Sequence, residues 1–180
     1  MQPLAEFASD TYSQQGEDGI IAECLSRIAT ATTLDKWCVE FGAWDGVYLS
    51  NTCRLIREAD YSAVMIEGDA ERFKELQANL PEDRVLKFLR WVSLSGDGRL
   101  ETILAETPIP QDFDFLSIDI DGCDWQIWDS IKEYKPKIVC VEFNPTIPNC
   151  VPYIQPADFS IKHGCGPRAL YDLAREKGYV

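Results

Sequence analysis

Short apolar runs alternate with amphipathic segments along most of the chain, and this alternation predicts the fold. Residues 17–29 carry apolar side chains at helical spacing. The nearly continuous apolar runs that follow are the predicted strands: 37–41, 62–66, 85–92, 113–118 and 137–143. The amphipathic segments between and after them are the predicted helices: 50–59, 70–80, 100–106, 123–133 and 168–177.

Strands that are apolar on both faces and are separated by helices are typical of a parallel sheet covered on both sides. The pattern therefore predicts an α/β fold with a doubly wound, mainly parallel, Rossmann-like sheet. The 180 residues suit a single domain over 1–180. The long segment 144–167 contains five prolines and no helical or strand pattern. We expect it to form a lid or a wall of the substrate site.

Composition and charge narrow the possible partners. The formal net charge is −13, which repels phosphate backbones and argues against nucleic acid as a partner. No apolar run is long enough to span a bilayer, and the first ten residues lack the pattern of a secretory signal. Seven scattered cysteines without a CxxC pair, and one histidine, argue against a zinc site. We expect a cytoplasmic protein with reduced cysteines and no membrane partner.

Acidic residues recur where the predicted strands end. Glu40, Glu67, Asp119 and Glu142 each end or directly follow an apolar run. In an open α/β sheet, ligands bind outside the carboxyl ends of the strands, so the four carboxylates are expected to line one crevice. The alternative for each acid taken singly is that it caps the helix that follows.

The turn after the first strand, Gly42-Ala43-Trp44-Asp45-Gly46, indicates a cofactor site. Glycine lets the backbone approach a ligand closely, and Glu67 ends the second strand, where an acid can bind ribose hydroxyls. The turn lacks the third glycine of GxGxxG, and the chain has no GxxxxGK[ST] motif. These features favour a nucleoside cofactor without phosphates, and S-adenosylmethionine is such a cofactor.

The chain resembles the FkbM-type class I S-adenosylmethionine-dependent methyltransferases from about Tyr12 onward. The matching segments are Tyr12-Ser13-Gln14-Gln15-Gly16-Glu17-Asp18, residues 39–46 with Ser50-Asn51-Thr52, Ile66-Glu67-Gly68-Asp69, Ser117-Ile118-Asp119-Ile120-Asp121-Gly122, Val141-Glu142-Phe143-Asn144-Pro145-Thr146 and Lys177-Gly178-Tyr179. The resemblance implies methyl transfer to a small-molecule or sugar acceptor, with a hydroxyl as the expected target.

The resemblance also implies roles for single residues. Glu40, Gly42 and Asp45, in the turn that closes at Gly46, would cradle the methionine part of the cofactor. Glu67 would hold the ribose. The loop that contains Ser93 and Asp97 would border the adenine.

Oxygen ligands for a divalent cation are predicted at two neighbouring strand ends. Asp119 and Asp121 follow the fourth strand, and Glu142 and Asn144 follow the fifth. All-oxygen ligands suit Mg²⁺, Ca²⁺ or Mn²⁺. The arrangement resembles that of catechol-type O-methyltransferases, in which the metal lowers the pKa of the acceptor hydroxyl. The alternative is that Asp121 caps a helix and Asn144 belongs to a turn.

A general base for a hydroxyl acceptor is predicted at His163, or at Asp119 or Asp121, acting directly or through a metal. His163 is the only histidine of the chain and lies in the long loop. The alternative interpretation is that it is a surface residue without a catalytic role. Trp44 and Trp125 are expected either to stack on a ring-shaped ligand or to pack structurally. Trp128 falls at helical spacing and is expected in the core.

Two other functions share parts of this pattern. The segment Asp119-Ile120-Asp121-Gly122-Cys123 is similar to the DxD metal site of glycosyltransferases. It also resembles the nucleophile motif of haloacid-dehalogenase-like phosphatases, with Cys123 at a position that differs from theirs. A non-catalytic Rossmann-like binding or assembly domain is the third possibility.

The resemblance also makes a prediction about the sheet edge. Class I methyltransferases usually add two more strands after the last helix, and this chain stops at Val180. We therefore expect a sheet without those strands, with residues 138–143 near an edge. That edge is predicted to pair with a second copy in a homo-oligomer or to be covered by the Pro-rich loop.

Overall fold

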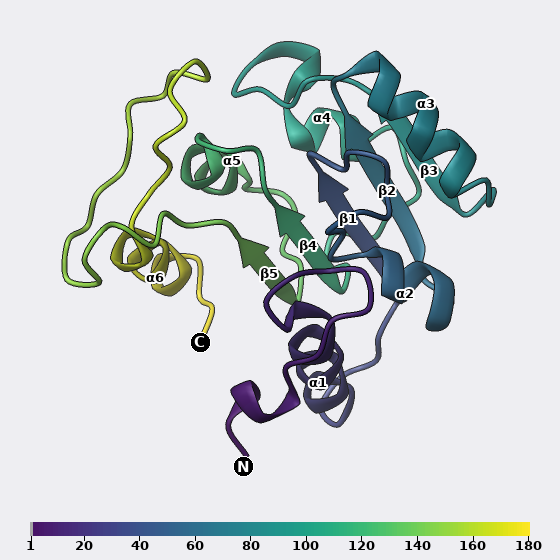
Figure 1. Ribbon diagram of the computed structural model, residues 1–180, viewed down its shortest axis with the longest axis horizontal. Helices are drawn as coiled ribbons and strands as arrows, with labels where there is room; N and C mark the ends of the chain where they lie inside the picture. Colours follow the sequence, from purple (N-terminus) through teal and green to yellow (C-terminus); the bar gives the residue numbers. More distant parts are fainter. Residues whose placement is uncertain (1) are drawn as a thin grey trace.

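A computed structural model describes residues 2–180 and shows a five-stranded parallel sheet with helices on both faces (Figure 1). The strands are β1 (Trp37–Phe41), β2 (Ser62–Glu67), β3 (Val85–Leu89), β4 (Phe115–Ile118) and β5 (Ile138–Val141). Their order is β3-β2-β1-β4-β5, and every neighbouring pair is parallel. The predicted Rossmann-like α/β fold is confirmed. The direction of winding reverses between β1 and β4, where such sheets form a crevice.

The helices separate into two layers around the sheet. They are α1 (Glu17–Ala29), α2 (Cys53–Glu58), α3 (Ala70–Asn79), α4 (Leu100–Leu104), α5 (Asp124–Ser130) and α6 (Pro167–Glu176), with short 3-10 turns η1 (Leu4–Phe7) and η2 (Gly96–Gly98). Buried residues of α4, α5 and α6 pack on one face, and those of α1, α2 and α3 pack on the other. Each strand is therefore covered on both sides, as its continuous apolar sequence requires.

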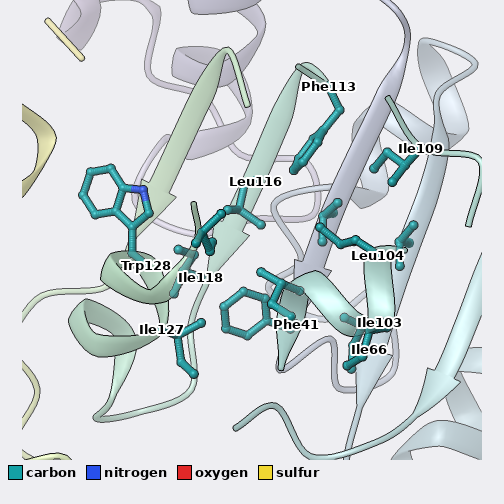
Figure 2. Close-up of a cluster of buried hydrophobic side chains, with 14 of the residues drawn as sticks. Phe41, Ile66, Ile103, Leu104, Ile109, Phe113, Leu116, Ile118, Ile127 and Trp128 are labelled. Carbon is teal, nitrogen blue, oxygen red and sulfur yellow. The ribbon is translucent and has the colours of Figure 1, made fainter. Parts of the chain in front are cut away.

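Successive side chains of a strand enter opposite halves of the core. In β1, Val39 and Phe41 pack against α4 and α5, whereas Cys38 packs on the opposite face. Figure 2 shows Phe41 beside Ile127 of α5 in the first of these clusters. Because side chains alternate between the two faces of a strand, Glu40 lies on the same side of the sheet as Cys38, the side covered by α1 and α2.

Several predicted elements are longer than the observed ones. The helix expected at 50–59 begins at Cys53, because the side chains of Ser50 and Thr52 bind the carboxylate of Glu40 before the helix starts. The strand expected at 85–92 ends at Leu89, so Trp91 lies in the loop after β3. In both cases the apolar sequence pattern is longer than the element. Side-chain hydrogen bonds delay the start of the helix, and strand pairing ends before the apolar run does.

The long loop 144–166 is irregular but tightly bonded. Gln155 is 2% exposed, and its Oε1 accepts hydrogen bonds from the amides of His163 and Gly164 at 2.9 and 2.7 Å. Its Nε2 donates to the Ile161 carbonyl at 2.9 Å, and Gln126 of α5 donates to its main-chain carbonyl. The side chain of Gln155 therefore holds the loop together, and its main-chain carbonyl ties the loop to α5, on the left of Figure 1.

The strand β5 forms one edge of the sheet, as predicted. The two ends of the Pro-rich loop meet just beyond this strand, where the Asn144 amide donates a hydrogen bond to the Cys165 carbonyl at 2.9 Å. Pairing of this edge with a second copy stays a prediction. Within residues 2–180, no helix is both long enough and apolar enough to cross a membrane.

Candidate ligand site at the carboxyl ends of the strands

A cavity of about 860 Å³ lies at the carboxyl ends of the strands. Glu40, Glu67, Asp119 and Glu142 all line it, from the ends of β1, β2, β4 and β5. The predicted common crevice is therefore confirmed. Its volume falls within the range of small-molecule and cofactor sites, about 300–1,000 Å³.

Glu67 joins the turns that follow β1 and β2. Its Oε2 accepts a hydrogen bond from the Trp44 amide, and its Oε1 accepts one from the Asp69 amide, both at 2.7 Å. The side chain is 5% exposed, yet it lines the cavity. Because a carboxylate has about four acceptor positions, two remain for a ligand hydroxyl.

Glu40 anchors the segment that precedes α2. Its Oε2 accepts hydrogen bonds from the hydroxyls of Ser50 and Thr52 at 2.6 Å, and its Oε1 accepts from the Asn51 amide at 2.9 Å. Burial raises the pKa of Glu40, and these three donors oppose that shift. Its main task in the structure is thus to hold the cavity wall 50–52 in place.

Gly42 and Gly46 of the first turn both have positive φ, and a close backbone contact adds a second requirement at Gly42. Gly42 has φ 72°, and a Cβ there would lie 2.1 Å from the Asp119 carbonyl oxygen. A Cβ at Gly46 would lie 2.5 Å from Leu76 of α3. Gly42 lines the cavity, but Gly46 and Asp45 do not, and Asp45 accepts from the amides of residues 47 and 48 instead.

Ser93 and Asp97, the residues predicted to border the adenine, lie outside the cavity wall. The Ser93 hydroxyl donates to the Ser95 carbonyl. Residues 90–92 line the cavity in their place. The ring of Trp91 lies on Gly68, where a Cβ would come within 2.2 Å of the indole.

Exposed apolar side chains gather at this cavity. Five of its lining residues are large, apolar and exposed: Trp44, Tyr48, Leu49, Trp91 and Phe159, with Trp91 at 74% exposure. Sequence reasoning missed all of them except Trp44. Trp91 fell inside the strand expected at 85–92, and the other three lie in loops without a periodic pattern. Trp128 is in the core, as predicted, and Trp125 donates to the Ala169 carbonyl and packs beside that core. Apolar surface concentrated at a cavity marks a binding region.

Three of the four predicted metal ligands lie together. Carboxylate oxygens of Asp119, Asp121 and Glu142 are all within 4.8 Å of one another. The turn that carries the two aspartates is held by Asp124, which is 1% exposed and accepts from the amides of Ile120 and Gly122 at 2.9 Å. The three carboxylates are therefore presented to the same point by a fixed turn and a strand end.

The carboxylates of this acidic cluster, Asp119, Asp121 and Glu142, disfavour each other's charge. Loss of solvation, followed by repulsion from Asp119 and its acidic neighbours, raises the pKa of Glu142 to about 7. Burial and the nearby Asp124 and Asp121 likewise raise the pKa of Asp119. Such a cluster gains stability from a proton or a divalent cation.

This repulsion predicts a pH-dependent stability when divalent cations are removed by a chelator. The folded pKa of Glu142 lies above its ordinary value of 4.5, so between the two values the folded state binds the proton more tightly. Its contribution to the free energy of unfolding is therefore complete below the lower value and is lost as the pH rises through about 7.

The variant Glu142→Gln isolates this contribution in urea unfolding measured across that range of pH. We expect the variant to match the wild type at acidic pH and to exceed it in stability above pH 7, the folded value of the Glu142 pKa being about 7. A difference between the two proteins that does not change with pH contradicts the expectation.

Asn144 and His163 lie beside a smaller cavity of about 120 Å³. Asn144 Nδ2 donates to the His163 carbonyl at 2.9 Å, and its Oδ1 accepts from the amide and the hydroxyl of Thr146. The amide oxygen predicted as a metal ligand is thus engaged in a turn. Asp121, Glu142 and Lys162 border both cavities. The ring of His163 packs edge-on against Tyr153, with 5.7 Å between centroids.

The long loop supplies part of the main cavity wall through Phe159 and Lys162. The ammonium of Lys162 donates to the Ile120 carbonyl at 3.1 Å, beside the acidic cluster. A comparison with models of known protein families found no match, and a comparison with curated proteins found no similar protein. Inferences about function therefore depend on the site itself.

Proposed function

We propose that the protein is an S-adenosylmethionine-dependent methyltransferase that methylates a hydroxyl group of a small molecule or sugar. The observation that carries the proposal is the position of Glu67. Its buried carboxylate ends β2, faces a cofactor-sized cavity at the switch point of a parallel sheet, and retains acceptor positions for ribose hydroxyls. The exposed indole of Trp91 beside it offers a stacking surface for adenine.

The donor set of the cavity fits such a cofactor. Glu67 would hold the ribose, Trp91 the adenine, and the wall formed by Gly42 and residues 50–51 the amino-acid end. Two lining arginines are already paired, Arg72 with Glu75 and Arg90 with Glu106. Among the described lining residues, Lys162 is then the one cation without a carboxylate partner, which is little positive charge for a pyrophosphate. The acidic protein favours a cationic sulfonium electrostatically.

When bound, the cofactor supplies an activated methyl group, so the chain has to align the acceptor, exclude water and remove a proton. The acidic cluster is suited to this last task. A carboxylate with a pKa of about 7, such as Glu142, can accept a hydroxyl proton near neutral pH. The same cluster would hold a divalent cation, which lowers the pKa of an acceptor hydroxyl.

Titration calorimetry with S-adenosylhomocysteine, with and without Mg²⁺, tests the proposal. We expect binding of one molecule per chain in both conditions, because Glu67 and Trp91 recognise the nucleoside without the cation. Absence of binding in both conditions would falsify the proposal.

A metal-dependent glycosyltransferase is the second candidate, because Asp119 and Asp121 form a DxD pair at the cavity. Such an enzyme binds a nucleoside diphosphate through the cation. Titration with uridine diphosphate and Mn²⁺ separates the two functions, since a methyltransferase is expected to bind S-adenosylhomocysteine and to ignore the diphosphate. A domain with only an assembly role would bind neither ligand.

A further inference from the structure

The turn that precedes α1 presents one glutamine to the cavity. Gln14 is exposed and lines the cavity, although it lies far in sequence from the strand-end turns that form the other walls. Within residues 2–180, its side-chain amide makes no hydrogen bond. Its main chain bonds only to Glu17: the N–H donates to Glu17 Oε2 at 3.4 Å, and the carbonyl accepts from the Glu17 amide at 3.2 Å. A free carboxamide on a cavity wall is available to a ligand.

Two acids build this turn. Asp18 is 3% exposed, and its Oδ2 accepts from the main-chain amides of residues 11, 12 and 13 at 2.8, 2.7 and 3.0 Å. Asp10 Oδ1 accepts from the Gly16 amide at 2.6 Å and from the Ser13 hydroxyl at 3.2 Å. The Ser13 hydroxyl in turn accepts from the Asp18 amide in the first turn of α1 at 2.8 Å.

The backbone on the C-terminal side of Gln14 is equally constrained. Gln15 and Gly16 both have positive φ, 57° and 89°, and a Cβ at Gly16 would lie 2.4 Å from the Ala8 Cβ. Left-handed backbone persists where surrounding contacts impose it. The position of Gln14 is therefore set by the fold of residues 8–18 and not by chance exposure of a loose terminus.

This turn lies at the β4 and β5 end of the site. Burial and then the charge of Glu17 raise the pKa of the Cys140 thiol in β5. Burial also raises the pKa of Glu17, and the charge of Asp119 after β4 contributes to that rise. The Cys140 sulfur lies 3.7 Å from Asn51 Nδ2, and Asn51 also donates to the Ser117 hydroxyl at 3.2 Å. The turn with Gln14 therefore lies on the β4 and β5 side of the cavity, whereas Glu67 ends β2 on the other side of β1.

We propose that the carboxamide of Gln14 binds the amino-acid end of the S-adenosylmethionine cofactor. This inference rests on the proposed function. With the nucleoside at Glu67 and Trp91, the amino-acid end reaches toward residues 50–51 and Gln14. A carboxamide carries both a donor for a carboxylate and an acceptor for an ammonium group, so it suits a zwitterion. It is also neutral, so it does not repel the sulfonium.

Calorimetry with two ligands tests this role. S-adenosylhomocysteine contains the amino-acid end, whereas 5′-methylthioadenosine keeps the nucleoside and lacks that end. Gln14→Ala is expected to weaken S-adenosylhomocysteine binding about tenfold to a hundredfold, as for loss of a hydrogen bond to a charged group, and to leave methylthioadenosine binding unchanged. Gln15→Asn is the matched control, because Gln15 does not line the cavity and asparagine tolerates its positive φ.

The outcomes separate the two proposals. If Gln14→Ala leaves S-adenosylhomocysteine binding unchanged, or weakens both ligands equally, the role of Gln14 at the amino-acid end is overturned while the methyltransferase proposal stands. If the wild-type protein binds neither ligand, the methyltransferase proposal itself fails. Weakening of the longer ligand alone, with Gln15→Asn behaving as wild type, supports the assignment.

Discussion

Replacing Glu67 with alanine is expected to reduce S-adenosylhomocysteine affinity about tenfold to a hundredfold, which corresponds to about 1–3 kcal/mol for a lost hydrogen bond to a charged group. The same change is expected to lower the free energy of unfolding. It leaves the Trp44 and Asp69 amides without their acceptor, and an unpartnered buried donor costs about 1–3 kcal/mol. Binding of methylthioadenosine should fall as well, because the ribose is common to both ligands.

Calorimetry and urea unfolding measure the two effects of Glu67→Ala separately. Glu71→Ala is the matched control: Glu71 is exposed in the first turn of α3 and pairs only with Lys74. Glu67→Gln keeps one oxygen for one amide, and its effect on stability should be intermediate. Unchanged ligand affinity in a folded Glu67→Ala protein would refute the ribose role, whatever its stability.

Replacing Asp119 with asparagine is expected to weaken Mg²⁺ or Mn²⁺ binding at the acidic cluster by at least about tenfold, because the cation loses one of three charged oxygen ligands. The proposed nucleoside contacts at Glu67 and Trp91 do not involve Asp119, so the variant should still bind S-adenosylhomocysteine. Methyl transfer should be lost, since the group that orients or deprotonates the acceptor has been altered.

Calorimetry with the metal alone provides the measurement for Asp119→Asn. Asp112→Asn is the matched control, because Asp112 is exposed and precedes the opposite, amino end of β4. Cation affinity that is the same in wild type and Asp119→Asn would remove the metal site from the mechanism. Loss of both cation and S-adenosylhomocysteine binding would indicate that Asp119 supports the cavity as a whole.

The prediction of the site from sequence succeeded where a residue's position follows from its strand. Glu40, Glu67, Asp119 and Glu142 each end a strand or directly follow one, and parallel strands end at one edge, so their meeting in one cavity was predictable. The prediction was less accurate in loops. Ser93 and Asp97 lie a few residues beyond the cavity, because β3 stops at Leu89 and the chain turns earlier than its apolar sequence suggests.

The glycines show a second limit of prediction from sequence. Gly46 was expected beside a cofactor, but it has φ 76° and lies against Leu76 of α3 and Leu80, the residue after that helix. A glycine in a turn after a strand can serve either a ligand or a packed neighbour, and the sequence pattern is the same in both cases. Only the position of the neighbouring helix distinguishes them.

The sequence by itself determined the α/β class, the parallel sheet and the acidic edge, because burial on both faces demands continuous apolar strands and the strand direction sets where they end. The tertiary structure decided which side chains reach the cavity from outside those strands. Gln14, Trp91 and Phe159 come from three segments distant in sequence. The positions of Gln14 and Phe159 depend on the Asp18 and Gln155 hydrogen-bond networks, which link residues across turns with no periodic pattern.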